Sequence, residues 1–554
     1  MIGWAKAAMP HLIVAPIVLP LATAALMLFA SERRRRLRAS LNVLSCAAAL
    51  AVAIALLLVV DERGAAAVGV YLPANWPAPF GIVLALDRLS AMMLVVTGVI
   101  AFAAVVYSVA RWDRAGVNFH PLFQLQLMGV NGAFLTVDVF NLFVFFEILL
   151  AASYGLLLHG SGASRVRAGL HYIAVNLFAS SLFLVGVAVL YGAAGTLNLA
   201  DFAARIPQVA AADRPLLHAG AAILAVAFLA KAAMWPLNFW LVPAYSAAGA
   251  PVAALFAILT KVGVYAILRI WTLFFGVDAG ESAHFGGAAL TWIGMASLAV
   301  ASIGMLASHH PGRLAAWGVV ISSATLVAAI GFARPSLTAG ALFYLIGSTF
   351  ALAALFLLVE LIDRAREVEP KVPLDDVDPL PFSVEYIERP DSNLDEDESV
   401  LIGRTIPGAL AFLGLAFIVC ALMIAGMPPL SGFLGKFAML SSALAPQPEL
   451  ASDPLSAPGI AALAMVVVLI GSGFLSLVGL SRAGIRYFWA PQERAAPRLR
   501  VIETLPIAAL LALCALLTIR AEPVMRYAAS TAQALHRPAA YVDAVLTARP
   551  VERQ

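Results

Sequence analysis

Four ionisable side chains lie deep inside long apolar stretches of the sequence and are the residues best suited to chemistry: Glu147, Lys231, Lys261 and Lys436. Only five of the 35 basic residues are lysines, so arginine supplies nearly all the remaining positive charge. A lysine removed from water can lose its proton near neutral pH, whereas arginine keeps its charge. Lysines placed in apolar stretches, where charge is costly, therefore indicate proton transfer.

The positions of these residues place them near the middle of membrane-spanning helices. Glu147 and Lys261 each lie nine residues from the nearer end of an apolar stretch, about 14 Å along a helix and roughly half the apolar thickness of a bilayer. Titratable groups at one depth can pass protons sideways through water. The hypothesis is that Glu147 pairs with Lys231, and that their separation sends the proton toward Lys261 and Lys436. The alternative is that each lysine forms a static ion pair or extends to the surface.

Other polar residues are weaker candidates because their positions have ordinary structural explanations. Histidines near span ends could admit protons but are more often interfacial. Charged residues there could be exit groups, helix caps or interfacial charges, and hydroxyl groups within spans could line a wet path or pack helices together. The candidates of these three kinds are His171, His218, His309, His310, Asp138, Asp87, Arg88, Tyr154, Ser322, Ser323, Thr325, Ser348 and Thr349.

The composition predicts a polytopic membrane protein. Of the 554 residues, 62% are hydrophobic and only 12% are charged, and the mean hydropathy is +0.93. Soluble domains are nearer half apolar. The net charge of +3 is too small and scattered to indicate nucleic-acid binding. The three cysteines, Cys46, Cys420 and Cys514, lie far apart in apolar stretches and predict neither disulfides nor a metal cluster.

The sequence lacks the residue patterns of the enzymatic alternatives. No histidine is followed by glutamate, so the zinc-protease helix motif is absent, and no Gly-x-Ser-x-Gly sequence occurs. Neither a phosphate-binding loop nor a pair of interior histidines for haem is visible. We therefore expect a chain that is not an enzyme and holds no cofactor and no metal.

With about 20 apolar residues taken as one helical span, the sequence predicts an all-α polytopic fold with about fourteen transmembrane helices. Arginines gather in the loops at one end of the alternating spans, which predicts that these loops are cytoplasmic and that both termini are external. The predicted spans are 10–30, 41–60, 87–110, 120–137, 138–158, 167–192, 217–242, 252–275, 287–308, 314–334, 338–361, 408–445, 459–481 and 502–520.

The seventh and twelfth spans are interrupted by proline. Pro236 and Pro243 follow Lys231, and the sequence GMPPLSG at 426–432 precedes Lys436. Backbone left unpaired at membrane depth persists only where protein or water satisfies it. Two such breaks, one in each half of a chain, are typical of inverted-repeat transporters with functional residues at the breaks.

Two further segments are polar. Residues 363–404 have no helical periodicity and include the acidic run at 395–398, so we expect a cytoplasmic loop that is either a solvated linker or docked on a partner. The tail at 521–554 alternates apolar and polar residues and could form an interfacial helix.

Three segments carry a family resemblance: DVFNLFVFFEILLAASYGL, FLAKAAMWPLNFWLVPAYSAAGAPVAALFAILTKVGVYAILRIW and MPPLSGFLGKFAML. Over about residues 80–490 the chain resembles the proton-translocating antiporter-like subunits of respiratory complex I, membrane hydrogenases and the Mrp (also Pha) sodium/proton antiporters. It is most similar to the D subunits of the Mrp/Pha type, because of the NLFVFFE sequence around Glu147, the length and the acidic insertion before the twelfth span.

The resemblance implies two inverted five-helix repeats, with broken helices 7 and 12, and assembly with the other Mrp subunits in a bacterial inner membrane. It also implies exchange of Na⁺ or K⁺ for H⁺, and it matches the family's proton-relay glutamate and lysines to Glu147, Lys231, Lys261 and Lys436. The implied parts are an N-terminal three-helix unit (1–110), a first repeat (120–275), a second repeat (287–481, with the acidic loop 363–405) and a last helix with its tail (502–554).

The sequence departs from the family pattern at Gly347, where relatives often carry a histidine. Water, Ser348 or Thr349 would then have to bridge the central axis. The alternative function is that of a proton-pumping membrane subunit in a redox complex of the complex I or hydrogenase type. A membrane scaffold without ion traffic fits the interior lysines poorly.

Overall fold

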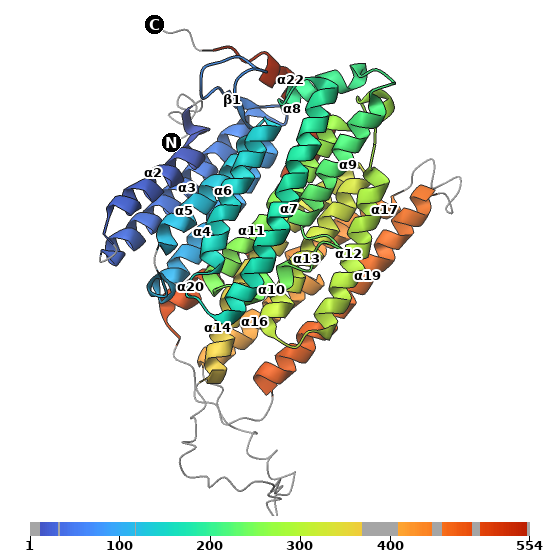
Figure 1. Cartoon of the computed structure of the whole chain (residues 1–554). Coiled ribbons are helices and arrows are strands. Elements are labelled where there is room, and N and C mark those ends of the chain that lie inside the picture. The colour runs from blue at the N-terminus through green and yellow to red at the C-terminus, as the bar shows by residue number, and fades with distance from the viewer. Residues whose placement is uncertain are drawn as a thin grey trace, which may run out of the picture.

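The structure is a computed structural model that describes residues 11–31, 34–116, 118–367, 408–445, 457–489 and 499–550. These residues form a bundle of long helices that lie side by side, with one short two-stranded sheet at one end of the bundle (Figure 1). We call that end the strand end and the opposite end the loop end.

The first predicted spans form a group of helices at one edge of the bundle. In this group, α3 (Arg35–Arg63) packs against α2 (Ala15–Phe29) and α4 (Arg88–Val109), and all three helices pack against α5 (Phe119–Leu135). Between α3 and α4, strands β1 (Gly69–Tyr71) and β2 (Leu84–Leu86) pair antiparallel, with Val70 opposite Ala85. This hairpin marks the strand end.

The middle of the chain contains the first broken span. Its helices are α6 (Val139–Leu157), α7 (Ala163–Ala194), α8 (Leu199–Arg205), α9 (Arg214–Lys231), α10 (Leu241–Ala247) and α11 (Ala250–Phe274). Short 3-10 turns cover Trp112–Arg114, Ile206–Gln208 and Gly280–Ser282.

The second half of the chain contains the second broken span. Its helices are α12 (Gly287–Ala307), α13 (Pro311–Gly331), α14 (Pro335–Glu367), α16 (Gly408–Ala425), α17 (Ser431–Leu444), α19 (Ala457–Gly484), a π-helical turn (Ile485–Trp489), α20 (Val501–Ile519), α21 (Ala521–His536) and α22 (Ala539–Leu546).

The prediction of an all-α polytopic membrane fold is confirmed. Within the described residues, 12 helices are long and apolar enough to cross a membrane by length and composition. The first and fourth predicted spans correspond to shorter helices, α2 with 15 residues and α5 with 17. The seventh and twelfth spans are broken, into α9 with α10 and α16 with α17.

Two helices, α11 and α14, form the centre of the bundle. Every residue of α11 is buried, and so is the whole apolar window of α14. Helix α14 packs against α11, α13, α16, α17 and α20. A polar side chain on either helix therefore meets other protein groups, because lipid does not reach it.

The C-terminal tail is helical and packs on the bundle. One face of α21 is buried against α14, and α22 reaches β1 and α8 at the strand end (Figure 1). The Tyr527 hydroxyl donates to the Arg88 carbonyl at 2.7 Å, and His536 Nε2 lies 3.0 Å from the Thr338 hydroxyl. Most of the predicted acidic loop, and with it the run at 395–398, lies outside the described residues.

Candidate functional site

Glu147 and Lys231 are connected through Ser180, a residue that the sequence alone did not single out. Glu147 lies on α6, Ser180 on α7, and Lys231 is the last residue of α9. The Ser180 hydroxyl donates to Glu147 Oε1, and Lys231 Nζ donates to the Ser180 oxygen at 3.1 Å. In this part of the described chain, the carboxylate and the ammonium thus share one hydroxyl instead of making a direct ion pair.

The Lys231 side chain is enclosed by protein on several sides. Its ammonium lies 5.0 Å from the centre of the Phe146 ring, within the range of a cation–π interaction. Helix α11 passes close behind it, since a Cβ atom at Gly263 would lie 3.0 Å from the Ala232 amide nitrogen. Lys231 is 5% exposed, so it does not extend to the surface as the alternative explanation requires.

The two broken spans end their first helices with the same backbone turn. After α9 the Met234 amide donates to the Leu229 carbonyl, and after α16 the Met427 amide donates to the Leu422 carbonyl, each at 2.9 Å. The residue before each methionine has a positive φ, 57° and 78° respectively. This is the C-terminal helix motif in which one residue adopts the left-handed conformation and the next amide donates a hydrogen bond to the carbonyl five residues earlier. The matching turns support a unit that is repeated in the two halves.

Lys436 binds carbonyl groups that the second break leaves without helical partners. Its ammonium donates to the carbonyl oxygens of Ile424 at 3.1 Å and Ala425 at 3.0 Å, the last two residues of α16. These oxygens carry the negative end of the helix dipole. Lys231 is the last residue of the helix before the first break, whereas Lys436 lies on the helix after the second break. Lys231 therefore precedes the prolines of its span in the sequence, and Lys436 follows the prolines of its span.

Lys261 lies in the middle of α11 and has no exposed surface. Its ammonium donates to the Ser323 hydroxyl of α13 at 3.1 Å and lies 3.4 Å from the Thr260 hydroxyl. Both of these partners are neutral. Among the described residues, Lys261 therefore forms no static ion pair of the kind that the alternative explanation requires.

Hydroxyl groups occupy the interval between Lys261 and Lys436. Ser322, the neighbour of Ser323, lies 2.9 Å from the Ser348 hydroxyl on α14. A Cβ atom at Gly347 would lie 2.9 Å from the hydroxyl oxygen of Ser431, the buried first residue of α17. Ser348 and Ser431 thus flank Gly347, the position at which the family resemblance leads us to expect a histidine.

Two other hydroxyls of the central helices bond their own helix. Thr349 and Thr325 donate to the carbonyls of Leu345 and Ile321. Tyr154 is half-buried, and its hydroxyl has no hydrogen-bond partner among the described residues. We therefore assign no bridging role to these three residues.

The structure places the predicted histidines away from the buried lysines. His171, His309 and His310 are exposed, and His171 bonds the Arg167 carbonyl of its own helix. His218 is half-buried beside Ser282, with its ring stacked 4.0 Å from that of Phe285. These are the ordinary positions that the sequence had favoured for them.

The predicted acidic and basic candidates at span ends have structural partners. Asp138 caps α6 by accepting from the Asn141 amide at 2.7 Å, and burial raises the pKa of its carboxyl group. Asp87 caps α4 and forms an ion pair with Arg269. Arg88 forms an ion pair with Asp61.

Among the described residues, the sequence reasoning missed the buried Arg269 on α11 and the half-buried Glu360 on α14. Glu360 accepts from the Trp112 indole at 2.6 Å and from the Tyr107 hydroxyl at 3.2 Å near the loop end. The signal that found the lysines, a charge inside an apolar stretch, is present at Arg269, whereas Glu360 lies at the end of its stretch, three residues before Asp363. Within the described residues, no group of three or more His, Cys, Asp or Glu side chains could hold a metal ion.

Comparisons with known proteins identify the family. Residues 136–380 match the family described as "NADH:quinone oxidoreductase/Mrp antiporter, TM". The chain is 49% identical over 541 residues to the probable K⁺/H⁺ antiporter D subunit of Rhizobium meliloti, covering 97% of this chain and 98% of that protein. The chain belongs to the family of antiporter D subunits. A second member, the Na⁺/H⁺ antiporter D subunit of Alkalihalophilus pseudofirmus, is 31% identical over 97% of this chain and 100% of its own length.

Solved structures have the same fold as this D-family chain. A chain in the structure of the Mrp complex from Dietzia sp. DQ12-45-1b aligns with a TM-score of 0.78 and 25% identity, covering 97% of this chain and 99% of that one. A chain of respiratory complex I from Thermus thermophilus aligns with a TM-score of 0.71 and 20% identity, covering 97% of this chain and 100% of that one. The second match concerns the fold alone.

Proposed function

We propose that this chain is the proton-translocating subunit of a multi-subunit antiporter that exchanges Na⁺ or K⁺ for H⁺ across a bacterial inner membrane. The observation that carries the proposal is the set of contacts made by Glu147 and the three lysines, four residues that we call the row. Each of the three lysines is buried and donates to hydroxyl or carbonyl oxygens, and the half-buried Glu147 accepts from the Ser180 hydroxyl. In this role the chain is part of a transporter and has no enzymatic reaction of its own.

In the proposed mechanism, Glu147 controls the charge of Lys231 through Ser180. While the carboxylate is ionised it favours the charged ammonium. Loss of that interaction favours the neutral amine, and the proton moves to Lys261. From Lys261 it passes along the hydroxyls of Ser323, Ser322, Ser348 and Ser431 to Lys436, with water filling the intervals.

The cation and the partners are inferred from the relatives. The relative that is 49% identical is named for K⁺, and the one that is 31% identical is named for Na⁺, so we favour K⁺. We propose that the other antiporter subunits surround this chain, and that its Arg-rich loop end faces the cytoplasm. The strand end then faces outward.

We also propose the repeat boundaries that the sequence predicts, with residues 120–275 as the first repeat and 287–481 as the second. The support for them is the matching turn after α9 and α16. A side chain near each break, Lys231 and Lys436, takes part in the row.

The proposed function is tested with Glu147→Ala and Lys231→Ala in the assembled antiporter in membrane vesicles. Each variant removes one end of the Ser180 link, and we expect each to abolish cation-dependent proton exchange while the complex still assembles. His171→Ala, at an exposed position on α7, serves as the matched control and should exchange at the wild-type rate. Normal exchange in both relay variants would overturn the proposal.

A further inference from the structure

A polar stripe runs along α11 from the middle of the bundle to the strand end. Lys261, Tyr265, Arg269 and Thr272 are spaced by four, four and three residues, which places them on one face of the helix. All four lie in a helix whose every residue is buried. The stripe therefore leads from a relay lysine toward the surface through the interior of the protein.

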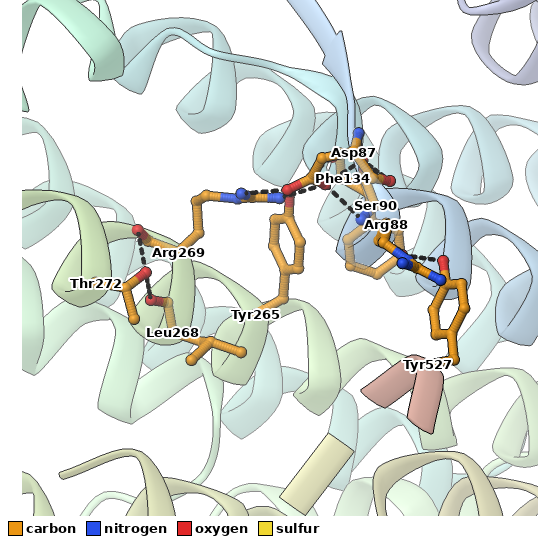
Figure 2. Close-up of polar contacts among 9 residues, drawn as sticks. All are labelled: Asp87, Arg88, Ser90, Phe134, Tyr265, Leu268, Arg269, Thr272 and Tyr527. Carbon is orange, nitrogen blue, oxygen red and sulfur yellow. Dashed lines mark hydrogen bonds and ion pairs between the residues drawn. The ribbon is translucent and has the colours of Figure 1, made fainter. Parts of the chain in front are cut away.

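The outer part of this stripe ends on a carboxylate from another helix. Arg269 donates to both oxygens of Asp87, at 2.7 Å each, and its guanidinium lies 3.4 Å from the Tyr265 hydroxyl. The Tyr265 hydroxyl in turn donates to the Phe134 carbonyl at 2.7 Å. Figure 2 shows the Arg269 and Tyr265 side chains converging on Asp87.

Asp87 is held in place from several elements. It caps α4 by accepting from the Ser90 amide at 2.9 Å. Burial alone would raise the pKa of its carboxyl group, but the charge of Arg269 and the hydrogen bonds from Arg269 and Ser90 hold this pKa below its usual range. The other charged or titratable groups around this cluster include Arg88, Asp61, Tyr527 and Tyr541, and Arg537 of the tail lines the cavity beside it.

A cavity of about 210 Å³ lies beside the pair, beneath the C-terminal helices. Asp87, Arg88 and Arg269 line one side of it, and α21 and α22 line the other with residues that include Thr531 and Tyr541. The Tyr541 ring lies 4.9 Å from the Arg269 guanidinium carbon, and the Tyr527 ring lies 4.3 Å from that of Arg88. The tail thus covers the charged pair and leaves space beside it.

We propose that Asp87 is a second, outward proton acceptor, and that its pairing with Arg269 is the gate between Lys261 and the cavity at the strand end. This inference depends on the proposed function, since it takes Lys261 to be a relay residue. A closed gate is the ion pair seen in the structure. An open gate has Arg269 withdrawn from the carboxylate.

Proton transfer through the gate conserves charge at each step. With the gate open, the Lys261 ammonium loses a proton and becomes a neutral amine. The Tyr265 hydroxyl takes up one proton and passes on another, and the Asp87 carboxylate becomes a carboxylic acid, which burial favours once Arg269 has withdrawn. When Arg269 returns, the acid releases its proton to external water and the ion pair forms again.

The decisive variant is the double substitution Asp87→Asn with Arg269→Gln. Asparagine caps a helix as well as aspartate does but takes up no proton, and removal of both charges leaves neither of them buried alone. We expect normal assembly and a rate of exchange lowered by about tenfold or more, the scale of a lost proton-transfer group. An assembled double variant with wild-type exchange would show that the pair is only a structural clamp.

Tyr265→Phe provides a second test that leaves both charges in place. It removes a hydroxyl that donates to a backbone carbonyl at 2.7 Å, as does the hydroxyl of Tyr487, which donates to His309. We expect Tyr265→Phe to slow exchange several-fold and the control Tyr487→Phe to leave it unchanged. Equal rates in both would overturn the inference.

The same assays separate this inference from the proposed function. If only the gate is wrong, the Asp87 and Tyr265 variants exchange normally while Glu147→Ala and Lys231→Ala remain inactive. If the relay itself is wrong, Glu147→Ala and Lys231→Ala also exchange normally, and the gate proposal falls with it.

Discussion

At the scale of single residues, serine hydroxyls connect the charged groups. A hydroxyl both donates and accepts, so one serine can join a carboxylate to an ammonium or pass a proton between them. Ser180 does this between Glu147 and Lys231, and Ser323 is the partner of Lys261. The buried lysines are therefore solvated by small neutral groups, which is the setting that the proposed proton transfer requires.

The two adjacent serines of α7 test this role directly. Ser180 is buried between Glu147 and Lys231, whereas Ser181 is exposed and donates to the Leu177 carbonyl of its own helix. We expect Ser180→Ala to lower proton-coupled exchange by about tenfold or more, because the link is lost. Ser181→Ala should have no effect. The measurement is the rate of proton-coupled cation exchange in membrane vesicles. Equal rates in the two variants would contradict a bridging role for Ser180.

At the scale of elements, the two broken spans bring helix ends into the middle of the bundle. A helix end there exposes carbonyl groups that an unbroken helix would bond internally. Lys436 uses two of them, and on the other break the Trp240 indole donates to the Ala230 carbonyl at 3.2 Å. The breaks thus create polar positions at a depth where lipid could supply none.

The turn at each break contains one residue with a left-handed backbone conformation. This residue is an alanine at the first break and a glycine at the second. Gly426 has a φ of 78°, and a Cβ atom there would lie 2.6 Å from Lys436 Cδ, whereas Ala233 already has a side chain at a φ of 57°. We expect Gly426→Ala to destabilise the protein by about 1–3 kcal/mol and to displace Lys436. Ala233→Gly should be neutral or stabilising, because it relieves that strain. Thermal unfolding of the purified protein measures the stability of both variants. A Gly426→Ala variant as stable as the Ala233→Gly variant would contradict the expected effect of the left-handed backbone.

At the scale of the whole molecule, the C-terminal tail ties the strand end together. Contacts from α21 and α22 reach α4, α11 and α14, through Arg88, Arg269 and Thr338. These three helices pack against one another and contribute groups to the proposed proton path or to the proposed Asp87 gate. The tail is therefore placed to hold their outer ends in register.

One of these contacts is sensitive to pH. Burial, and then the charge of nearby His284, lowers the pKa of His536 from its usual 6.5 to about 4. Between these two values the unfolded segment binds more protons than the packed one, so the contact is strongest above the higher pKa and weakens as pH falls toward the lower one. We expect hydrogen exchange of α21 amides, corrected for intrinsic rate, to be faster at about pH 5 than at about pH 7.

His536→Gln provides the control for this experiment. Glutamine can still hydrogen-bond the Thr338 hydroxyl but does not titrate. The pH dependence of α21 exchange should therefore disappear in this variant. Its persistence would show that another group controls the contact.

From the sequence alone, the membrane fold, the broken spans and the four ionisable residues within the spans could be predicted. Each depends on a local property, such as an apolar stretch long enough to span a bilayer, a proline within it, or a charge deep inside it. The same signal is present at Arg269, but an arginine cannot give up a proton, and the position of its partner Asp87 at the start of a span predicts an interfacial residue.

Only the tertiary structure decided which groups connect these residues. Ser180 lies 33 positions from Glu147 and 51 from Lys231 in the sequence, and no periodicity relates positions so far apart. The pairing of Asp87 with Arg269, and the tail that covers it, likewise depend on how α4, α11 and α22 pack. A local sequence pattern indicates how unfavourable a residue would be in lipid. The partner that such a residue contacts depends instead on the packing of helices that are distant in the chain.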